Sequence, residues 1–353
     1  MAEWKEWVDR PHEAPSGDSS APPPMLASLA EPERAGRPPR RAPWTARLVV
    51  AATALLVLGP ILALGLPAEI SRWYEAAAIE KRLDGDLEGA IETLDQALRW
   101  RPHAPSVYLR RAEWKLQRKD YRGALADYDR AIQLAPHTPQ AYIWRSRALQ
   151  HLGRHQEAIA DWHRAEQYQD GAVGSRASML NGLAYAQALG NTELDQALEN
   201  VETALRYVDS LESLLKPDPA VSGDRGRWWL RKLQSLVESD NRSRIELELI
   251  GTKAAMLDTR GYIQLLRGEL EAAQRDLDEA VKLIEVRLER RSQSTDYIDR
   301  REFELEMEEE RQSAAVIHYH RALLYDRLGQ TAEADRDRER IRQLGYEPGS
   351  HLF

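Results

Sequence analysis

Several residue types and patterns that define common protein classes are missing from this chain. Its 353 residues include no cysteine, which excludes a disulfide-stapled fold and a zinc site with cysteine ligands. Runs typical of β-strands are almost absent after residue 72, where the apolar residues follow a helical period instead. Acidic residues outnumber basic ones by 57 to 49, and the net charge of -8 argues against a general nucleic-acid-binding protein.

Catalytic and metal-binding motifs are missing as well. The chain contains neither the G-x-x-x-x-G-K-[ST] phosphate loop nor the G-x-G-x-x-G dinucleotide motif. His151 and His155 are four residues apart, but Gly153 lies between them, so they do not share one face of a continuous helix. We therefore predict no catalytic, cofactor-binding or metal-ligating residue, no cofactor, and a protein that is not an enzyme.

Proline is concentrated near the N-terminus. Half of the 18 prolines lie between residues 11 and 43, a stretch without an apolar period. Because proline interrupts helices and cannot donate a backbone hydrogen bond, we expect residues 1–47 to form a disordered leader. The last part of this leader, residues 34–47, contains five arginines and no acidic residue.

A long apolar run follows this basic segment. Residues 48–68 read LVVAATALLVLGPILALGLPA, a run of 21 residues without a charged side chain. A helix of this length spans about 31 Å, close to the ~30 Å hydrocarbon core of a bilayer. Pro60 lies in the middle of the run, a position that membrane helices tolerate. The sequence therefore predicts a single transmembrane helix at residues 48–68.

The charges on either side of this segment predict its orientation. The positive-inside rule places the arginine-rich N-terminus in the cytoplasm and the rest of the chain on the exocytoplasmic side. A cleaved signal peptide is the alternative, because Ala63-Leu64-Gly65 offers small residues for cleavage. The excess of 41 arginines over 8 lysines is typical of a GC-rich bacterial genome, which indicates the inner (plasma) membrane and a periplasmic location for the remainder.

The remainder of the chain repeats itself with a period of 34 residues. Three sets of equivalent residues define the period: Tyr74, Tyr108 and Tyr142; Ala90, Ala124 and Ala158; Ala97, Ala131 and Ala165. The predicted units are residues 71–104, 105–138, 139–172, 178–211, 254–287 and 315–348. Each unit reads as two helices that approach closely at the alanines, most of them joined at a glycine. Since one helix pair cannot bury its own apolar face, neighbouring pairs must stack into a solenoid.

In these features the sequence resembles the tetratricopeptide repeat (TPR) family. The resemblance is carried by the 34-residue unit and by two stretches, Leu152-Gly153-Arg154 to Ala158 and Leu328-Gly329-Gln330 to Ala334. The full W-x-x-L-G-x-x-Y signature is absent from the first helices. The resemblance implies an all-α helix-turn-helix solenoid of about six units, whose first helices line a groove that holds an extended or helical peptide.

Two segments break the period. Residues 212–253 form an insertion between four units at 71–211 and two units at 254–348. Residues 288–314 are dense in charge, and we expect them to extend one helix or to form an exposed arm. In the first insertion, Trp228 and Trp229 are candidates for a plug of the solenoid or for an interface anchor.

Carried onto this chain, the resemblance assigns partner-binding residues to the groove. They come from the first helices of the first three units: Arg72, Glu75, Arg82, Leu109, Glu113, Leu116, Gln140, Ile143 and Arg147. Some family members clamp a peptide carboxylate with lysine and asparagine side chains. Glu75, Glu113 and Ile143 stand at such positions here, so that binding of a chaperone tail is disfavoured.

Taken together, these features favour a membrane-anchored scaffold that binds a peptide or helix of a protein partner in the TPR groove, in envelope assembly or client handling. Two alternatives remain open. One is a membrane receptor whose solenoid faces the cytoplasm. The other is a regulatory subunit of an enzyme complex.

Overall fold

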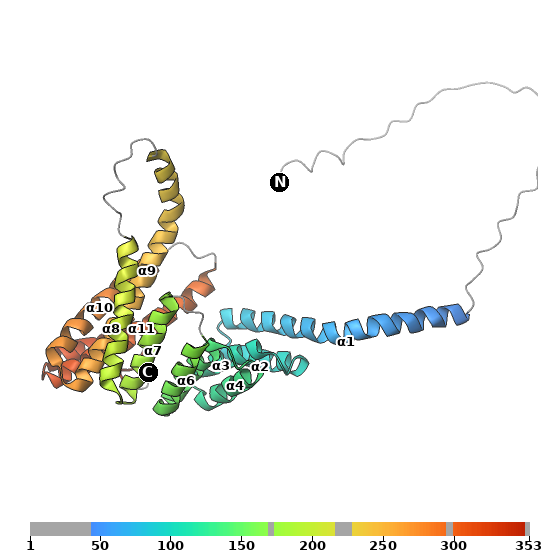
Figure 1. Ribbon diagram of the computed structural model, residues 1–353, viewed down its shortest axis with the longest axis horizontal. Helices are drawn as coiled ribbons and strands as arrows, with labels where there is room; N and C mark the ends of the chain where they lie inside the picture. Colours follow the sequence, from blue (N-terminus) through green and yellow to red (C-terminus); the bar gives the residue numbers. More distant parts are fainter. Residues whose placement is uncertain (1–43, 169–172, 216–227, 294–298, 350–353) are drawn as a thin grey trace, which may run out of the picture. The chain divides into compact units, whose positions relative to one another are not determined.

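The computed structural model describes residues 44–168, 173–215, 228–293 and 299–349. Every regular element in these ranges is an α-helix, which confirms the all-α prediction for them. The helices are α1 Trp44–Leu83, α2 Leu87–Trp100, α3 Pro105–Gln117, α4 Tyr121–Leu134, α5 Pro139–His151, α6 His155–Gln167, α7 Val173–Leu189, α8 Leu194–Leu215, α9 Trp228–Arg267, α10 Leu270–Ser292, α11 Arg300–Arg327 and α12 Thr331–Gln343 (Figure 1).

The chain divides into two compact units, residues 1–59 and 60–353. In the first unit, the predicted leader up to residue 43 lies outside the described residues, and the described part is the beginning of α1. No helix in the described part of the chain has both the length and the apolar character that a membrane crossing needs. Several side chains of the expected transmembrane segment 48–68, among them residues 60–64, lie outside the described set, so this segment stays a prediction.

The second unit is built from pairs of helices joined by short turns. Contacts join α3 to α4 and α5 to α6, and the later helices from α7 to α12 pair in the same order. Ala90, Ala124 and Ala158 are fully buried where paired helices meet, as the repeat predicts. Pro105 and Pro139 begin α3 and α5, because the fixed φ of proline suits the first helical turn. The two-helix unit expected from the 34-residue period is therefore present in the described residues.

Most of the turns between paired helices contain a glycine in the left-handed region. The φ angles of Gly85, Gly153, Gly268 and Gly329 are 84°, 70°, 79° and 71°. Glycine adopts this conformation without a steric penalty. In the second pair the equivalent position is occupied by Lys119, with a φ of 64°. A residue with a Cβ atom loses about 1–2 kcal/mol in this conformation.

The apolar core is divided among neighbouring helices. Leu94 of α2 and Val107 of α3 belong to a cluster that also includes Ala78 of α1. Tyr128 lies in the next cluster, between α3, α4 and α5. A larger cluster, which includes the fully buried Ile263, joins α7 to α12. Each repeat thus buries its apolar face against its neighbours, as a solenoid requires.

The two interruptions of the sequence period continue into long helices. α9 has 40 residues and runs without a break through the boundary expected at residue 253, and Figure 1 shows its N-terminal part extending beyond α8. α11 has 28 residues and combines part of the 288–314 segment with the first helix of the last repeat. The side chains of Trp228 and Trp229 lie outside the described residues.

A buried ion pair ties these two extensions together. Arg287 Nη2 of α10 lies 2.6 Å from Glu310 Oε1 of α11, and both side chains are only 10% exposed. The other terminal nitrogen of Arg287 donates to the Leu247 carbonyl oxygen of α9 at 2.9 Å. Gly251 leaves the space for this arginine, because a Cβ atom there would overlap the guanidinium group. Two segments that are separate interruptions in the sequence are therefore structural partners.

Candidate protein-binding surface

Three of the predicted binding residues come from first helices that adjoin one another, since Arg82 of α1 donates to Gln117 of α3 and α3 contacts α5. Arg82 of α1, Glu113 of α3 and Arg147 of α5 come from successive first helices, and both arginines act electrostatically on the Glu113 carboxylate. Arg82 is held by two hydrogen bonds, of 3.0 and 3.2 Å, which it donates to Gln117 Oε1. We call the surface formed by Arg82, Glu113 and Arg147 the first-helix face.

A fourth charged residue, far along the chain, interacts electrostatically with this face. The charge of Glu309 in α11 interacts with those of Arg82 and Arg147. Burial raises the pKa of Glu113 and the nearby Glu309 charge raises it further, while the arginines act in the opposite direction. Burial is also the main reason why the pKa of Glu309 is raised. The charges of the first-helix face therefore interact electrostatically with a carboxylate of the protein itself.

The predicted aliphatic residues of the groove pack between helices. Leu109 and Leu116 are half-buried against the cluster that contains Tyr128. Ile143 packs in the same way against the cluster around Trp162. These three side chains contribute to the core that joins successive repeats.

The remaining predicted residues are exposed or interact with residues of their own helix. Arg72 forms an ion pair of 2.9 Å with Glu69 on its own helix, and both side chains are about two-thirds exposed. Glu75 accepts a hydrogen bond of 3.3 Å from the Ser71 hydroxyl. Gln140 is exposed at the start of α5. Arg72 and Glu75 thus have partners on their own helix, and Gln140 is exposed.

One ion pair recurs in several of the helix pairs, and the pattern of apolar residues does not predict it. In each case an arginine on the first helix binds an aspartate that follows it by 16 residues on the second helix: Arg111–Asp127, Arg145–Asp161, Arg260–Asp276 and Arg321–Asp337. Nε and Nη2 of each arginine donate to the two carboxylate oxygens over 2.5–2.9 Å. The constant spacing of 16 is the sequence signal that would have identified these pairs, which we call the Arg–Asp braces.

The braces also connect neighbouring repeats. Arg145 Nη1 donates to Asp129 on the preceding second helix at 2.6 Å, and the guanidinium group lies over the Tyr142 ring. Arg111 makes the equivalent bond to Asp95 of the first repeat, also at 2.6 Å. The hydrogen bonds that Arg145 donates to Asp161 outweigh the effect of burial and raise the pKa of Arg145. The arginines are therefore charged residues that fix one helix pair to the next.

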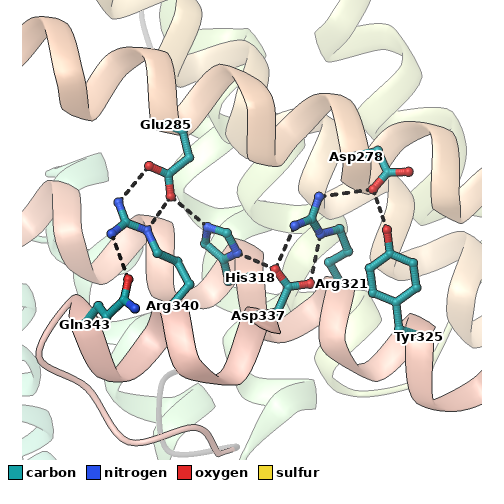
Figure 2. A network of polar contacts seen from close by, with 8 residues as sticks. All are labelled: Asp278, Glu285, His318, Arg321, Tyr325, Asp337, Arg340 and Gln343. Carbon is teal, nitrogen blue, oxygen red and sulfur yellow. Dashed lines mark hydrogen bonds and ion pairs between the residues drawn. The ribbon is translucent and has the colours of Figure 1, made fainter. Parts of the chain in front are cut away.

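The last repeat carries an extended form of this network (Figure 2). His318 Nδ1 lies 2.6 Å from Asp337 Oδ1, and His318 Nε2 lies 3.0 Å from Glu285 Oε1. Arg321 binds Asp337 from the other side, and Arg340 binds Glu285 at 2.7 Å. Burial lowers the pKa of His318, but the hydrogen bonds to the two carboxylates outweigh it and raise the pKa above its usual value. The hydrogen bond from His318 is the main reason why the pKa of Glu285 falls to about 2.

This network is structural, because its histidine is inaccessible to a solute. The side chain of His318 is only 5% exposed, and that of Asp337 only 1%. Within the described residues, no group of three or more histidine, aspartate or glutamate side chains is arranged to hold a metal ion. His151, which the sequence singled out, stacks on Tyr121 with ring centroids 4.3 Å apart, and burial lowers its pKa to about 4.

Comparison with known proteins gives similarity to solved structures alone. No family model matches the chain, and no curated protein matches it. The structure of PilW, described as a widely conserved type IV pilus biogenesis factor, is similar at 13% identity and a TM-score of 0.48 over 80% of this chain and 96% of its own. MamA from Desulfovibrio magneticus is similar at 13% identity and a TM-score of 0.42, over 64% of this chain and 97% of its own. A tetratricopeptide repeat protein from Parabacteroides merdae is similar at 12% identity and a TM-score of 0.41, over 78% and 93%.

Proposed function

We propose that the protein is a membrane-anchored scaffold that binds a peptide or a helix of a protein partner on its first-helix face. The observation that supports this proposal best is that the first helices of three successive repeats adjoin one another, since Arg82 of α1 donates to Gln117 of α3 and α3 contacts α5, which carries Arg147. Repeats that present equivalent positions side by side form an extended surface, which suits an elongated ligand. Charged side chains of both signs on this surface select a ligand by its charges.

The membrane part of the proposal is supported by the apolar surface of α1. The side chains of Leu48, Val49, Leu56 and Leu66 are each more than half exposed. Exposed aliphatic side chains on one helix are unfavourable in water, whereas the acyl chains of a bilayer would cover them. With the arginine-rich residues 34–47 before the apolar segment 48–68, we propose a cytoplasmic N-terminus, repeats in the periplasm of a bacterial inner membrane, and a role in envelope assembly or client handling.

Cross-linking in intact membranes, with the full-length protein as bait, tests the binding site. We expect a cross-linked partner that is lost from R82E/R147E and kept by the matched control R122E, because Arg122 is exposed on the second helix α4. A partner that both variants keep, or that both lose, would count against this face. Leu109 is unsuitable for the test, because it packs in the core.

A C-terminal fusion to a fluorescent protein that folds only in the cytoplasm tests the orientation. We expect cells that express this fusion to stay dark, since the repeats are proposed to lie in the periplasm. Fluorescent cells would reverse the orientation and favour a receptor that faces the cytoplasm.

A further inference from the structure

We propose that two exposed tryptophans of the first repeat, Trp73 and Trp100, bind the headgroup layer of a lipid bilayer, an inference that rests on the membrane anchoring proposed above. The bilayer surface concerned is the one at which the apolar segment 48–68 ends. The first repeat then contacts the membrane directly, and the bilayer covers a surface that the described repeats leave exposed.

The first observation is that Trp73 lies just beyond the end of the apolar segment, on the same helix α1. It follows Ala68 by five residues, which corresponds to about 7.5 Å along an α-helix. A bilayer with a hydrocarbon core of ~30 Å is about 40–45 Å thick with its headgroups, so that each headgroup layer is about 5–7.5 Å deep. Helical side chains lean towards the N-terminus, which brings the Trp73 ring closer to Ala68. Trp73 therefore reaches the headgroup layer when the apolar segment ends at the edge of the hydrocarbon core.

The second observation is that Trp100 lies at the same end of the first repeat. α1 ends at Leu83, and α2 runs back from Leu87 to Trp100. Its 14 residues return the chain by about 20 Å, to the height of Ile70 on α1. Both tryptophans therefore lie at nearly the same height along α1, shortly after the apolar segment.

The aromatic residues of the third repeat support this placement. Tyr142 and Tyr168, which are equivalent to Tyr74 and Trp100, have ring centroids only 5.7 Å apart. In the first repeat, the Tyr74 ring meets the Trp73 ring edge-on at 4.9 Å. The first repeat thus gathers its aromatic side chains at the end where the apolar segment enters.

The third observation is that Trp73 is exposed at a position that later repeats bury. Trp73 is 65% exposed and Trp100 45%, whereas Val107 and Ala141, at the position of Trp73 in the second and third repeats, are each 1% exposed. Val107 packs against the first repeat, but the described residues before Trp73 continue α1 instead of forming a preceding helix pair. Trp73 is thus left for another surface to cover. Tryptophan suits a membrane interface, because its ring is apolar and its N–H group needs a polar partner.

The fourth observation is that the charge around Trp100 complements lipid phosphates. Residues 99–104 read RWRPHA, with two arginines and no acidic residue. Arg99 is exposed and Arg101 half-buried, and guanidinium groups bind phosphate oxygens well. A second copy of the chain that docked symmetrically on this surface would bring these arginines together, and like charges at an interface are unfavourable. The charge therefore favours the headgroup layer over a second copy.

Fluorescence quenching tests the contact on the full-length protein in vesicles of phosphatidylcholine and phosphatidylglycerol. The chain has no cysteine, so a single fluorophore can be attached at S106C or at R122C. Ser106 is exposed in the first turn of α3, six residues after Trp100, and Arg122 is exposed at the opposite end of the second repeat. We expect a quencher on the lipid headgroups to quench the fluorophore at S106C and to leave the one at R122C unquenched. Equal quenching at the two sites would overturn the proposal.

The variant W73S/W100S tests whether the tryptophans make this contact. Both side chains are exposed, so the variant should fold, which circular dichroism checks. Quenching at S106C should fall towards that at R122C in W73S/W100S and stay at the wild-type level in the matched control I79S. Ile79 is also exposed on α1, but it lies about 9 Å further from Ala68 than Trp73 does.

Two results with this variant would overturn the proposal. One is quenching at S106C that W73S/W100S leaves unchanged. The other is a dimer of the wild-type protein in detergent that W73S/W100S dissociates, because a second copy would then cover the tryptophans. Light scattering measures the mass of both proteins.

Extraction of the vesicles with alkaline carbonate separates this inference from the membrane anchor proposed above. If the vesicles retain the protein but S106C is quenched no more than R122C, the anchor stands and the binding of the tryptophans to the bilayer is wrong. If carbonate releases a protein whose S106C fluorophore had been quenched, the tryptophans bind the bilayer surface and the transmembrane anchor is wrong.

Discussion

At the scale of single residues, charged pairs hold the repeats together. Asp161 is only 2% exposed and Arg145 only 15%, so both charges have left most of their water. Two hydrogen bonds between them, and a third from Arg145 to Asp129, replace that hydration. A buried ion pair adds little to the net stability of a protein. Removing one of its two partners is costly, because the other charge then stays buried without compensation.

Replacing Asp161 by alanine should destabilise the protein by about 3 kcal/mol, because Arg145 then stays buried without its main partner. Thermal denaturation followed by circular dichroism measures this loss. The matched control is D335A. The Asp335 side chain is 73% exposed, so its replacement should change stability by less than about 1 kcal/mol. The double variant R145L/D161L should lose less than D161A, and a larger loss would contradict this account.

His318 should make stability depend on pH. Its pKa is raised in the folded protein, since its hydrogen bonds to Asp337 and Glu285 outweigh burial. The histidine therefore contributes its full stabilisation below its unfolded pKa of about 6.5 and loses it as the pH rises through the folded value. Melting temperatures measured between about pH 6 and pH 9 should fall in the wild type.

The variant H318Q isolates this effect. It should be less stable than the wild type by about 2 kcal/mol at pH 6, because two hydrogen bonds to charged groups are lost. Above the folded pKa of His318 the difference should shrink. An identical pH dependence in both proteins would show that another group is responsible.

At the scale of the elements, turns and helix extensions decide where the repeat is regular. Gly153 adopts a φ of 70° in the turn before α6, and Lys119 adopts 64° in the turn before α4. Only the glycine is free of strain there. The extensions of α9 and α11 are stabilised by a buried ion pair instead of by a turn residue. Arg287 and Glu310 form this pair and hold the extensions against their neighbours.

Replacing Lys119 by glycine should therefore stabilise the protein by about 0.5–1 kcal/mol. The gain of about 1–2 kcal/mol from relieved strain exceeds the cost of a more flexible unfolded chain, about 0.5–1 kcal/mol. Urea denaturation at neutral pH measures the difference. G153A is the converse test and should destabilise, and a K119G protein less stable than the wild type would contradict the strain argument.

At the scale of the whole molecule, the repeat could be predicted from the sequence. The contact between the first and the last repeats, made by Arg301 and Asp84, could not. Buried alanines such as Ala124 are set by how closely two helices approach, and turn glycines such as Gly153 by a positive φ, so that both recur at a fixed spacing. Leu109, at a position that the resemblance assigns to the groove, is half-buried and packs against the cluster that contains Tyr128, which its place in the repeat alone does not predict. The pairing of Arg301 with Asp84 obeys no local rule, since 217 positions separate the two residues.

The Arg–Asp braces also predict which repeats open most easily. The first repeat has Ala77 and Thr93 at the brace positions, and the fourth has Ala184 and Asn200. Amide hydrogen exchange should be faster by about tenfold or more in α1–α2 and α7–α8 than in α3–α6, because a lost charged hydrogen bond lowers local stability. In D161A, exchange in α5–α6 should rise to the same level. Uniform exchange in the wild type would show that the braces do not set local stability.

The unbraced first repeat has a consequence under mechanical load. If the chain is held at its N-terminal end while a partner pulls on the later repeats, the force passes through α1 and α2 before it reaches a braced pair. Helices held by apolar contacts such as those of Ala78 and Leu94, without a buried guanidinium–carboxylate pair between them, separate at lower force than helices cross-linked by such a pair. The first repeat would then extend while the others keep their shape, so that it acts as a compliant spring between the point of attachment and the rest of the molecule.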